Sequence, residues 1–264
     1  MFEWGIFALI GVFTGLFAGL LGLGGGLVVV PALVVVFSMQ GQPESQLIHV
    51  AIGTSLMTII ITSLSSMYAH HQNKNINWQV VARFSPGLIL GGFLGAFFAT
   101  VLTNDFLQQC FSVYVFLVVI QMWLPISSTI DERLLKQPIL FSVGTVVGSL
   151  SALLGIGGGS FVVPYLVMAK QSIQRAIGTS AACGFPISVA AVISFLIFGQ
   201  DRYSTTSIWQ TGVIHWQAFF GIISTSILFA LIGARLAKRL PVNILKQIFS
   251  FILIIIGLYL LKLK

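Results

Sequence analysis

Charged residues are scarce in this chain of 264 residues, where Asp, Glu, Lys and Arg together make up 7% of the sequence and hydrophobic residues make up 57%. An ordinary soluble domain is about 25% charged. These few charged side chains cannot cover the surface of a globule of this size, and the composition therefore excludes a soluble protein. It predicts helices that span a lipid bilayer. The formal net charge is +7, but the basic residues form no stripe that could follow phosphates, which excludes a nucleic-acid-binding protein.

Cysteine is also rare, and both cysteines, Cys110 and Cys183, lie inside apolar segments. We interpret each as a small buried hydrophobe and expect no disulfide framework. Basic residues are missing from positions 1–4, and the apolar run that follows is too long for a cleavable signal peptide, so we expect the first helix to be retained. No histidine is paired with a carboxylate at metal-ligand spacing, so we expect neither a metal site nor a cofactor.

Long apolar runs fill most of the chain, and polar turn residues separate most of them. The runs cover residues 5–23, 27–38, 47–69, 80–103 and 106–124 in the first half, and 139–156, 161–169, 176–198, 215–237 and 242–261 in the second half. We therefore expect an all-α polytopic membrane protein. Residues 1–130 would form a first membrane repeat and residues 131–264 a second one, within a single transport domain.

The two halves repeat one another in sequence. A glycine-rich stretch at residues 15–31 recurs at residues 148–164, and the pentapeptide Ala-Ile-Gly-Thr-Ser occurs at both 51–55 and 176–180. Further matches pair Trp78-Gln79 with Trp216-Gln217 and Gly95-Ala96 with Gly233-Ala234. Internal repeats of this kind in a membrane protein are typical of transporters.

Residues 5–38 are apolar over a length that one helix could not hold within a bilayer. As a single helix they would measure about 51 Å, against a hydrocarbon core of roughly 30 Å. The triple glycine at 24–26 has low helix propensity and should break the helix, and the apolar run after it is too short to cross. We predict a hairpin that returns to its own side, either as a re-entrant pair or as one full helix followed by a broken one.

The distribution of basic residues distinguishes two arrangements of the halves. If each hairpin returns to its own side, the halves are inverted and only Arg202, Lys262 and Lys264 lie opposite the other basic residues. These others are Lys74, Arg83, Arg133, Lys136, Lys170, Arg175, Arg235, Lys238, Arg239 and Lys246. If each hairpin counts as one crossing, the halves are parallel and the basic residues divide almost equally. The positive-inside rule favours inverted repeats with both termini outside the cytoplasm.

Small residues recur along one face of the first helix of each half. They are Gly11, Gly15, Gly19 and Gly22 in the first half, and Gly144, Gly148, Ala152 and Gly155 in the second. This spacing is typical of close helix packing in membranes, and we expect these residues to pack helices.

The triple glycines are the candidate substrate site. Backbone that leaves a helix within a bilayer is tolerated where it lines a polar cavity. A helix that restarts after such a break points its unpaired N–H groups and its partial positive charge toward the membrane middle. Two such helix N-termini, facing each other from the two halves, could bind a small anion without any charged side chain. The alternative is a packing kink that binds no ligand.

Hydroxyl side chains near the glycines extend this candidate site. Two Thr-Ser pairs lie near the start of the next long helix in each half, where they could donate to an oxyanion or bond to the preceding turn. Ser160 follows the second triple glycine, and its counterpart is Leu27, so the site would be asymmetric. The predicted substrate-binding residues are therefore Gly24, Gly25, Gly26, Thr54, Ser55, Gly157, Gly158, Gly159, Ser160, Thr179 and Ser180.

The glycine motifs resemble those of the TauE/SafE sulfite exporter family, also called the TSUP superfamily. The resemblance rests on Gly15-x3-Gly19-x2-Gly22-x-Gly24-Gly25-Gly26-x4-Pro31, on its copy at 148–164 and on the paired Gly-Thr-Ser, and it covers nearly the whole chain. The second copy has Ala152 where the first has Gly19. The resemblance implies an integral transporter of the bacterial inner membrane with eight or so membrane segments. Its substrate would be sulfite, a sulfonate, sulfoacetate or a related sulfur-containing or organic anion.

A secondary transporter for a small anion is therefore the leading hypothesis, with the anion and the lipid bilayer as its partners. Neither glycine cluster is followed by Gly-Lys-Ser/Thr, so the chain lacks an ATP-binding motif and we expect no enzyme activity. All 6 acidic residues lie in loops or at segment ends. This placement favours uniport, or coupling carried by the anion itself, over a proton relay through an intramembrane carboxylate. The direction of transport, the coupling ion and the oligomeric state stay open.

Two other functions are weaker alternatives. A membrane thiol–disulfide electron carrier would use Cys110 and Cys183, but these positions are not equivalent in the two repeats. An intramembrane hydrolase would need a nucleophile with a partner inside the membrane, and no serine pairs convincingly with a histidine or a lysine.

Overall fold

The protein is described by a computed structural model that covers residues 2–22, 24–123, 132–199 and 208–237, together with residues 247, 250, 251, 253–255, 257 and 258. Its helices are α1 (Phe2–Leu21), α2 (Gly26–Met39), α3 (Leu47–Gln72), α4 (Trp78–Val101), α5 (Asn104–Trp123), the 3-10 helix η1 (Glu132–Leu135), α6 (Gln137–Leu154), α7 (Gly159–Met168), α8 (Ile173–Phe198) and α9 (Trp216–Leu236). Two short antiparallel strands, β1 (Gln210–Thr211) and β2 (Ile214–His215), precede α9. The predicted all-α membrane architecture is confirmed.

Each predicted apolar segment up to residue 237 is matched by one helix. In the described parts of the chain, 7 helices are long and apolar enough to cross a membrane, whereas α2 and α7 have only 14 and 10 residues. By length, α1 is a full helix and α2, which follows it, is a short one. This matches the second of the two expected hairpin forms. The last predicted segment, 242–261, lies mostly outside the described residues.

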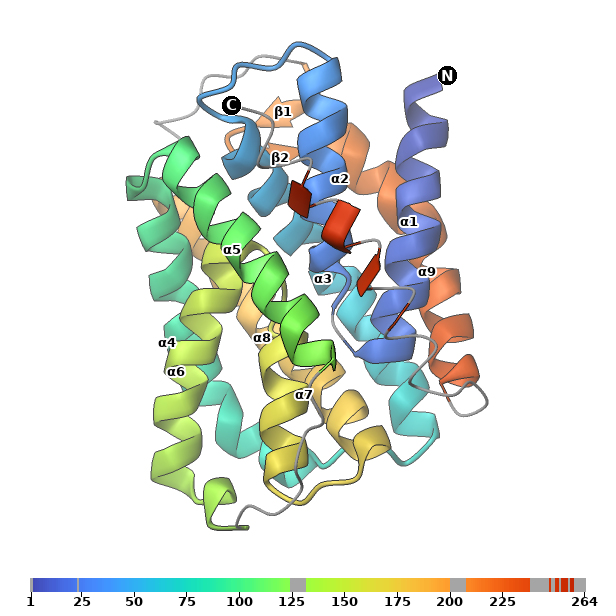
Figure 1. Ribbon diagram of the computed structural model, residues 1–264, viewed down its shortest axis with the longest axis vertical. Coiled ribbons are helices and arrows are strands. Elements are labelled where there is room, and N and C mark those ends of the chain that lie inside the picture. Colours follow the sequence, from blue (N-terminus) through green and yellow to red (C-terminus); the bar gives the residue numbers. More distant parts are fainter. Residues whose placement is uncertain are drawn as a thin grey trace.

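The two helical hairpins open at opposite ends of the molecule. Figure 1 shows α1 running inward from the end that holds the N-terminus, and α2 returning to that end. In contrast, α6 starts at the other end and α7 returns to it. Each of the two sharp breaks, between α1 and α2 and between α6 and α7, therefore lies inside the bundle.

Glycine faces hold two pairs of helices in close contact. In α1, a Cβ atom on Gly11, Gly15 or Gly19 would collide with a backbone carbonyl oxygen of α9. In α4, Gly87, Gly91 and Gly95 approach the backbone of α6 in the same way, and Gly148 of α6 approaches the backbone of α4. Both contacts join one helix from each half of the chain. The predicted close helix packing is confirmed for Gly11, Gly15, Gly19, Gly144 and Gly148. Gly22 and Gly155, which the prediction placed on the same faces, instead follow the ends of α1 and α6 and have positive φ.

Two helices of 26 residues each, α3 and α8, pack against each other at the centre of the bundle. Around them, α3 also contacts α2 and α9, and α8 also contacts α7 and α4. Each central helix thus packs against its own half and against the other half. Since α3 and α8 carry the two Gly-Thr-Ser motifs, these motifs lie in the middle of the molecule.

The described basic residues gather at one end of the bundle. The described parts of the chain contain the basic residues Lys74, Arg83, Arg133, Lys136, Lys170, Arg175 and Arg235, and all of them belong to the end opposite the N-terminus. Of the described acidic residues, Glu3, Glu44 and Asp105 belong to the end that holds the N-terminus, whereas Glu132 of η1 belongs to the basic end. The described basic residues therefore share one end, as the inverted arrangement requires.

Candidate functional site

Both helix breaks are made by glycines with positive φ, a conformation that residues with a side chain adopt only with strain. The φ angles are 66°, 69° and 81° at Gly22, Gly24 and Gly25, and 71°, 74° and 85° at Gly155, Gly157 and Gly158. The same series of backbone conformations thus occurs at corresponding positions of the two glycine motifs. Glycine is required here because the chain must turn within a few residues inside the bundle.

The two breaks lie against each other. A Cβ atom on Gly26 would overlap the carbonyl oxygen of Gly155, and one on Gly24 would lie 3.3 Å from the carbonyl oxygen of Ile156. All the glycines of both triplets are buried. The structure therefore brings the two predicted halves of the site together in the interior of the bundle.

Helix α2 begins with N–H groups that have no acceptor among the described residues. Its first backbone hydrogen bonds run from the N–H groups of Val28 and Val29 to the carbonyl oxygen of Gly25, at 3.0 and 3.2 Å. No side chain caps the helix. Within the described residues, the N–H groups of Gly26 and Leu27 have no hydrogen-bond acceptor.

Helix α7 begins in the same way. The N–H groups of Phe161 and Val162 donate to the carbonyl oxygen of Gly158 at 3.1 and 2.9 Å, and no side chain caps the helix. The N–H groups of Gly159 and Ser160 find no acceptor in the part of the chain that the structure describes. Unpaired N–H groups and the positive end of the helix dipole attract negative charge.

The serines of the Gly-Thr-Ser motifs hold the breaks reciprocally. The hydroxyl of Ser55, in the first half, donates to the carbonyl oxygen of Gly155 at 2.8 Å. The hydroxyl of Ser180, in the second half, donates to the carbonyl oxygen of Gly22 at 3.2 Å. Each half therefore fixes the position at which the other half leaves its helix.

The threonines of the same motifs bind the helix starts of the opposite half. The Thr54 hydroxyl accepts the N–H of His215 at 2.9 Å, and the Thr179 hydroxyl accepts the N–H of Asn77 at 3.0 Å. His215 and Asn77 are the N-caps of α9 and α4. The motif hydroxyls thus bond to the other half of the chain rather than to the preceding turn of their own helices.

Three hydroxyl side chains gather at the second break. The hydroxyls of Ser160 and Tyr114 are hydrogen-bonded to each other, and the Tyr114 ring packs 4.9 Å from that of Phe161. Ser151 of α6 is fully buried close to Gly158. Sequence reasoning missed Tyr114 and Ser151. The signal for Ser151 was available, because this serine stands where the first copy of the motif has Ala18.

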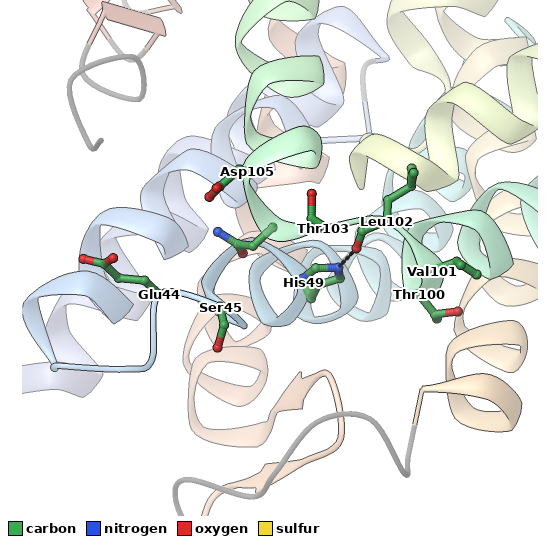
Figure 2. Close-up of a pocket in the computed structure, with 9 residues that line it drawn as sticks. Glu44, Ser45, His49, Thr100, Val101, Leu102, Thr103 and Asp105 are labelled. Carbon is green, nitrogen blue, oxygen red and sulfur yellow. Dashed lines mark hydrogen bonds between the residues drawn. The ribbon is translucent and has the colours of Figure 1, made fainter.

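Two cavities lie at the end of the bundle that holds the N-terminus, away from the breaks. The larger, of about 620 Å³, lies between the α2–α3 and α4–α5 connections. Figure 2 shows Glu44, Asp105 and His49 on its wall, with His49 Nε2 at 3.1 Å from the carbonyl oxygen of Leu102. The two carboxylates make this cavity unfavourable for a resident anion, since like charges repel.

The smaller cavity, of about 470 Å³, is lined by Glu3, His215 and Gln217 among others. Gln217 Nε2 donates to a carboxylate oxygen of Glu3 at 3.0 Å. His215 Nδ1 accepts the N–H of Ala218 at 3.2 Å and so caps α9. Burial lowers the pKa of the His215 imidazole, while the charge of Glu3 acts in the opposite direction.

Metal and disulfide chemistry find no support in the described residues. Among them, no group of three or more His, Cys, Asp or Glu side chains is placed to hold a metal ion. Cys110 and Cys183 are both free thiols, with Cys183 buried in α8. No disulfide therefore joins the pair that an electron carrier would need.

Comparison with known proteins supports this description. The family model "Sulfite exporter TauE/SafE" matches residues 7–260. A probable membrane transporter protein of Haemophilus influenzae is 35% identical over 251 residues, covering 95% of both chains. A probable membrane transporter protein of Methanocaldococcus jannaschii is 28% identical and covers 96% of this chain and 93% of its own length. No solved structure matches the chain significantly.

Proposed function

The chain belongs to the sulfite exporter TauE/SafE family, and from this premise we propose that it is a secondary transporter for a small anion. The substrate class is sulfite, a sulfonate or another sulfur-containing or organic anion. The observation that carries the proposal is the meeting of two broken helices inside the bundle, each with N–H groups at its start that have no acceptor among the described residues. Such helix starts stabilise negative charge without burying a basic side chain.

The proposed substrate-binding residues fall into two classes. The glycines of the two triplets present backbone N–H groups to the anion, and the hydroxyls hold these groups in position and donate to the anion once the breaks move apart. They are Gly24, Gly25, Gly26, Gly157, Gly158 and Gly159, together with Thr54, Ser55, Ser160, Thr179 and Ser180. Because all these residues are buried, we assign the conformation to a closed state of the transport cycle.

We also propose that residues 1–130 and 131–264 are inverted repeats in the bacterial inner membrane. Three observations support this. The hairpins open at opposite ends, contacts are exchanged reciprocally between the halves, and the described basic residues share one end. By the positive-inside rule that end is cytoplasmic and both termini are periplasmic. A reporter fused after Lys264 tests this arrangement, and a cytoplasmic signal from it would overturn the inverted arrangement.

The energy source follows from where the acids lie. Every described Asp and Glu lies in a loop or at a helix start, at Glu3, Glu44, Asp105 and Glu132. Intramembrane carboxylates are the usual proton relays of coupled transporters. We therefore propose uniport or coupling carried by the anion itself. Flux that follows an imposed pH gradient and disappears in a Glu44→Gln or Asp105→Asn variant would contradict this.

Flux through reconstituted vesicles tests the proposed site. The panel is sulfite, thiosulfate, methanesulfonate and acetate, and the variants are Gly25→Val and Gly158→Val. Both positions have positive φ and a close neighbour, so valine should distort each helix start. We expect at least tenfold lower flux in both variants. The matched control is Gly5→Val, because a Cβ at Gly5 meets nothing within 4 Å.

Thermal unfolding in detergent separates a lost site from a lost fold. A Gly25→Val or Gly158→Val protein that unfolds like the wild type but fails to carry the anion supports the proposal. Normal flux in both variants would show that the glycines only pack helices. Absence of wild-type flux for every anion of the panel would reject the proposed substrate class.

A further inference from the structure

Ser151 presents an unexplained polar group at the second break. It is 0% exposed, and its hydroxyl has no hydrogen-bond partner in the described parts of the chain. The hydroxyl oxygen lies 3.4 Å from the position that a Cβ on Gly158 would occupy, and Gly158 is the N-cap of α7. A buried hydroxyl without a partner is costly and calls for an explanation.

Two more hydroxyls lie at the first turn of the same helix. Ser160 is the second residue of α7, and the hydroxyl of Tyr114 reaches it from α5. Both residues are buried, at 4% and 7% exposure. Three hydroxyls, together with the unpaired N–H groups of Gly159 and Ser160, therefore gather at the start of α7.

At the first break, the described hydroxyls already donate to backbone carbonyl oxygens. Leu27 stands where the second break has Ser160, and Ala18 stands where it has Ser151. Beside Gly25 lies the methyl group of Thr14, whose hydroxyl donates to the carbonyl oxygen of Ile10 at 2.6 Å. The hydroxyl of Thr62 also reaches this break, but it donates to the carbonyl oxygen of Gly24 at 3.4 Å.

We propose that the start of α7 is the selective half of the anion site, and that Ser151, Ser160 and Tyr114 choose singly charged anions with three oxygens. A sulfonate or hydrogen sulfite has this form. The inference rests on the proposed function, and it adds two residues, Ser151 and Tyr114, that are not among the substrate-binding residues predicted from the sequence.

Donor number and charge both lead to this class of substrate. Three hydroxyls and two N–H groups can serve three oxygens, each with more than one lone pair, whereas a carboxylate presents two oxygens and a halide has no directional lone pairs. Every charged residue among those described lies in a loop or near a helix end. Desolvating a second negative charge would therefore go uncompensated, which excludes sulfate as the preferred ligand.

Binding measurements on the full-length protein in detergent test the inference. Methanesulfonate and acetate are titrated by calorimetry into the wild type and into Ser151→Ala and Tyr114→Phe. We expect each substitution to weaken methanesulfonate binding about tenfold, the effect of losing one hydrogen bond to a charged group. Acetate binding should change less, so the preference for the sulfonate should fall. The matched control is Ser194→Ala, because Ser194 is also 0% exposed and without a partner in the described residues.

Stability without ligand supplies a second readout. Removing an unpaired buried hydroxyl should leave the melting temperature of Ser151→Ala unchanged or higher, while the stabilisation by methanesulfonate should shrink. If both variants bind methanesulfonate as the Ser194→Ala control does, the inference is rejected and the proposed function stands. If the wild type binds neither anion and carries none of the flux panel, the proposed function itself is rejected.

Discussion

The break between α1 and α2 and the break between α6 and α7 share a backbone conformation but differ in the side chains around them. Three glycines with positive φ form each break, and a serine from the other half holds each one. Around the first break, Leu27 and the methyl group of Thr14 are apolar. Around the second break, the hydroxyls of Ser160 and Tyr114 are hydrogen-bonded to each other.

This difference separates the requirement for a sharp backbone turn from the requirement for side chains that select a ligand. A sharp turn with positive φ favours glycine, and both breaks have this backbone conformation. Selecting a ligand needs only one set of side-chain donors. Under the proposed function, the side chains at the second break would select the anion, and the first break would contribute mainly the dipole of α2.

The largest effect should come from separating the two breaks. Gly26 has ordinary φ, but a Cβ there would overlap the carbonyl oxygen of Gly155. Overpacking typically costs about 1–3 kcal/mol and occasionally more, and we expect the upper end here because the overlapping atom belongs to the backbone. We expect Gly26→Val to lower the melting temperature in detergent and to abolish flux, while Gly5→Val changes neither. A stable Gly26→Val protein with normal flux would show that contact between the breaks is not needed.

A smaller effect should follow from removing the reciprocal serine bonds. Ser55→Ala leaves the buried carbonyl oxygen of Gly155 without its donor, and Ser180→Ala does the same to Gly22. Each loss should destabilise the protein by about 1–3 kcal/mol. Ser55→Ala should have the larger effect, since its bond is 2.8 Å against 3.2 Å.

The double variant tests whether the two bonds act together. Both serines hold parts of one contact between the breaks, so the combined loss should differ from the sum of the single losses. Denaturant titrations of the four proteins in detergent give this coupling directly. Strict additivity would indicate that the two breaks are held independently, against their contact in the structure.

The helices and the breaks could be predicted from the sequence because both depend on local properties. Apolar run length determines a membrane helix, and a triple glycine interrupts one whatever lies around it. The close packing of Gly11, Gly15 and Gly19 followed from their spacing for the same reason. These features therefore needed no knowledge of which helices are neighbours.

The partners of the hydroxyls could not be predicted, because they depend on tertiary packing. Ser55 and Thr54 were expected near the site, but nothing in the sequence indicates that they bond to Gly155 and His215. Tyr114 stands in a long apolar helix, and its direction depends on how α5 rests against α7. Whether these groups also touch the anion stays a prediction.

A more modest change should come from giving the first break the hydroxyl it lacks. Leu27→Ser places a serine at the counterpart of Ser160, and a further donor at the start of α2 should strengthen methanesulfonate binding about threefold, less than a full charged hydrogen bond. Leu33→Ser is the control, because Leu33 is equally buried on the same helix. Both variants lose apolar packing, but only Leu27→Ser should gain affinity. Equal affinities in calorimetry would contradict the assignment of the first break to the anion site.

The smallest effect concerns the caps that the motif threonines bind. Thr179 binds Asn77, which does not titrate, whereas Thr54 binds His215, whose pKa is lowered from 6.5 by burial. At pH values between the two pKa values of His215, the unfolded chain therefore binds more protons than the folded chain. The contribution of His215 to stability is complete above pH 6.5 and is lost as the pH falls through the pKa of the folded state. Protonated Nδ1 could no longer accept the N–H of Ala218. As the pH is lowered across this range, the melting temperature of the wild type should fall. It should fall less in His215→Asn, because asparagine, the N-cap residue at Asn77 in the first half, does not titrate. An equal fall in both proteins would assign the pH dependence to other groups.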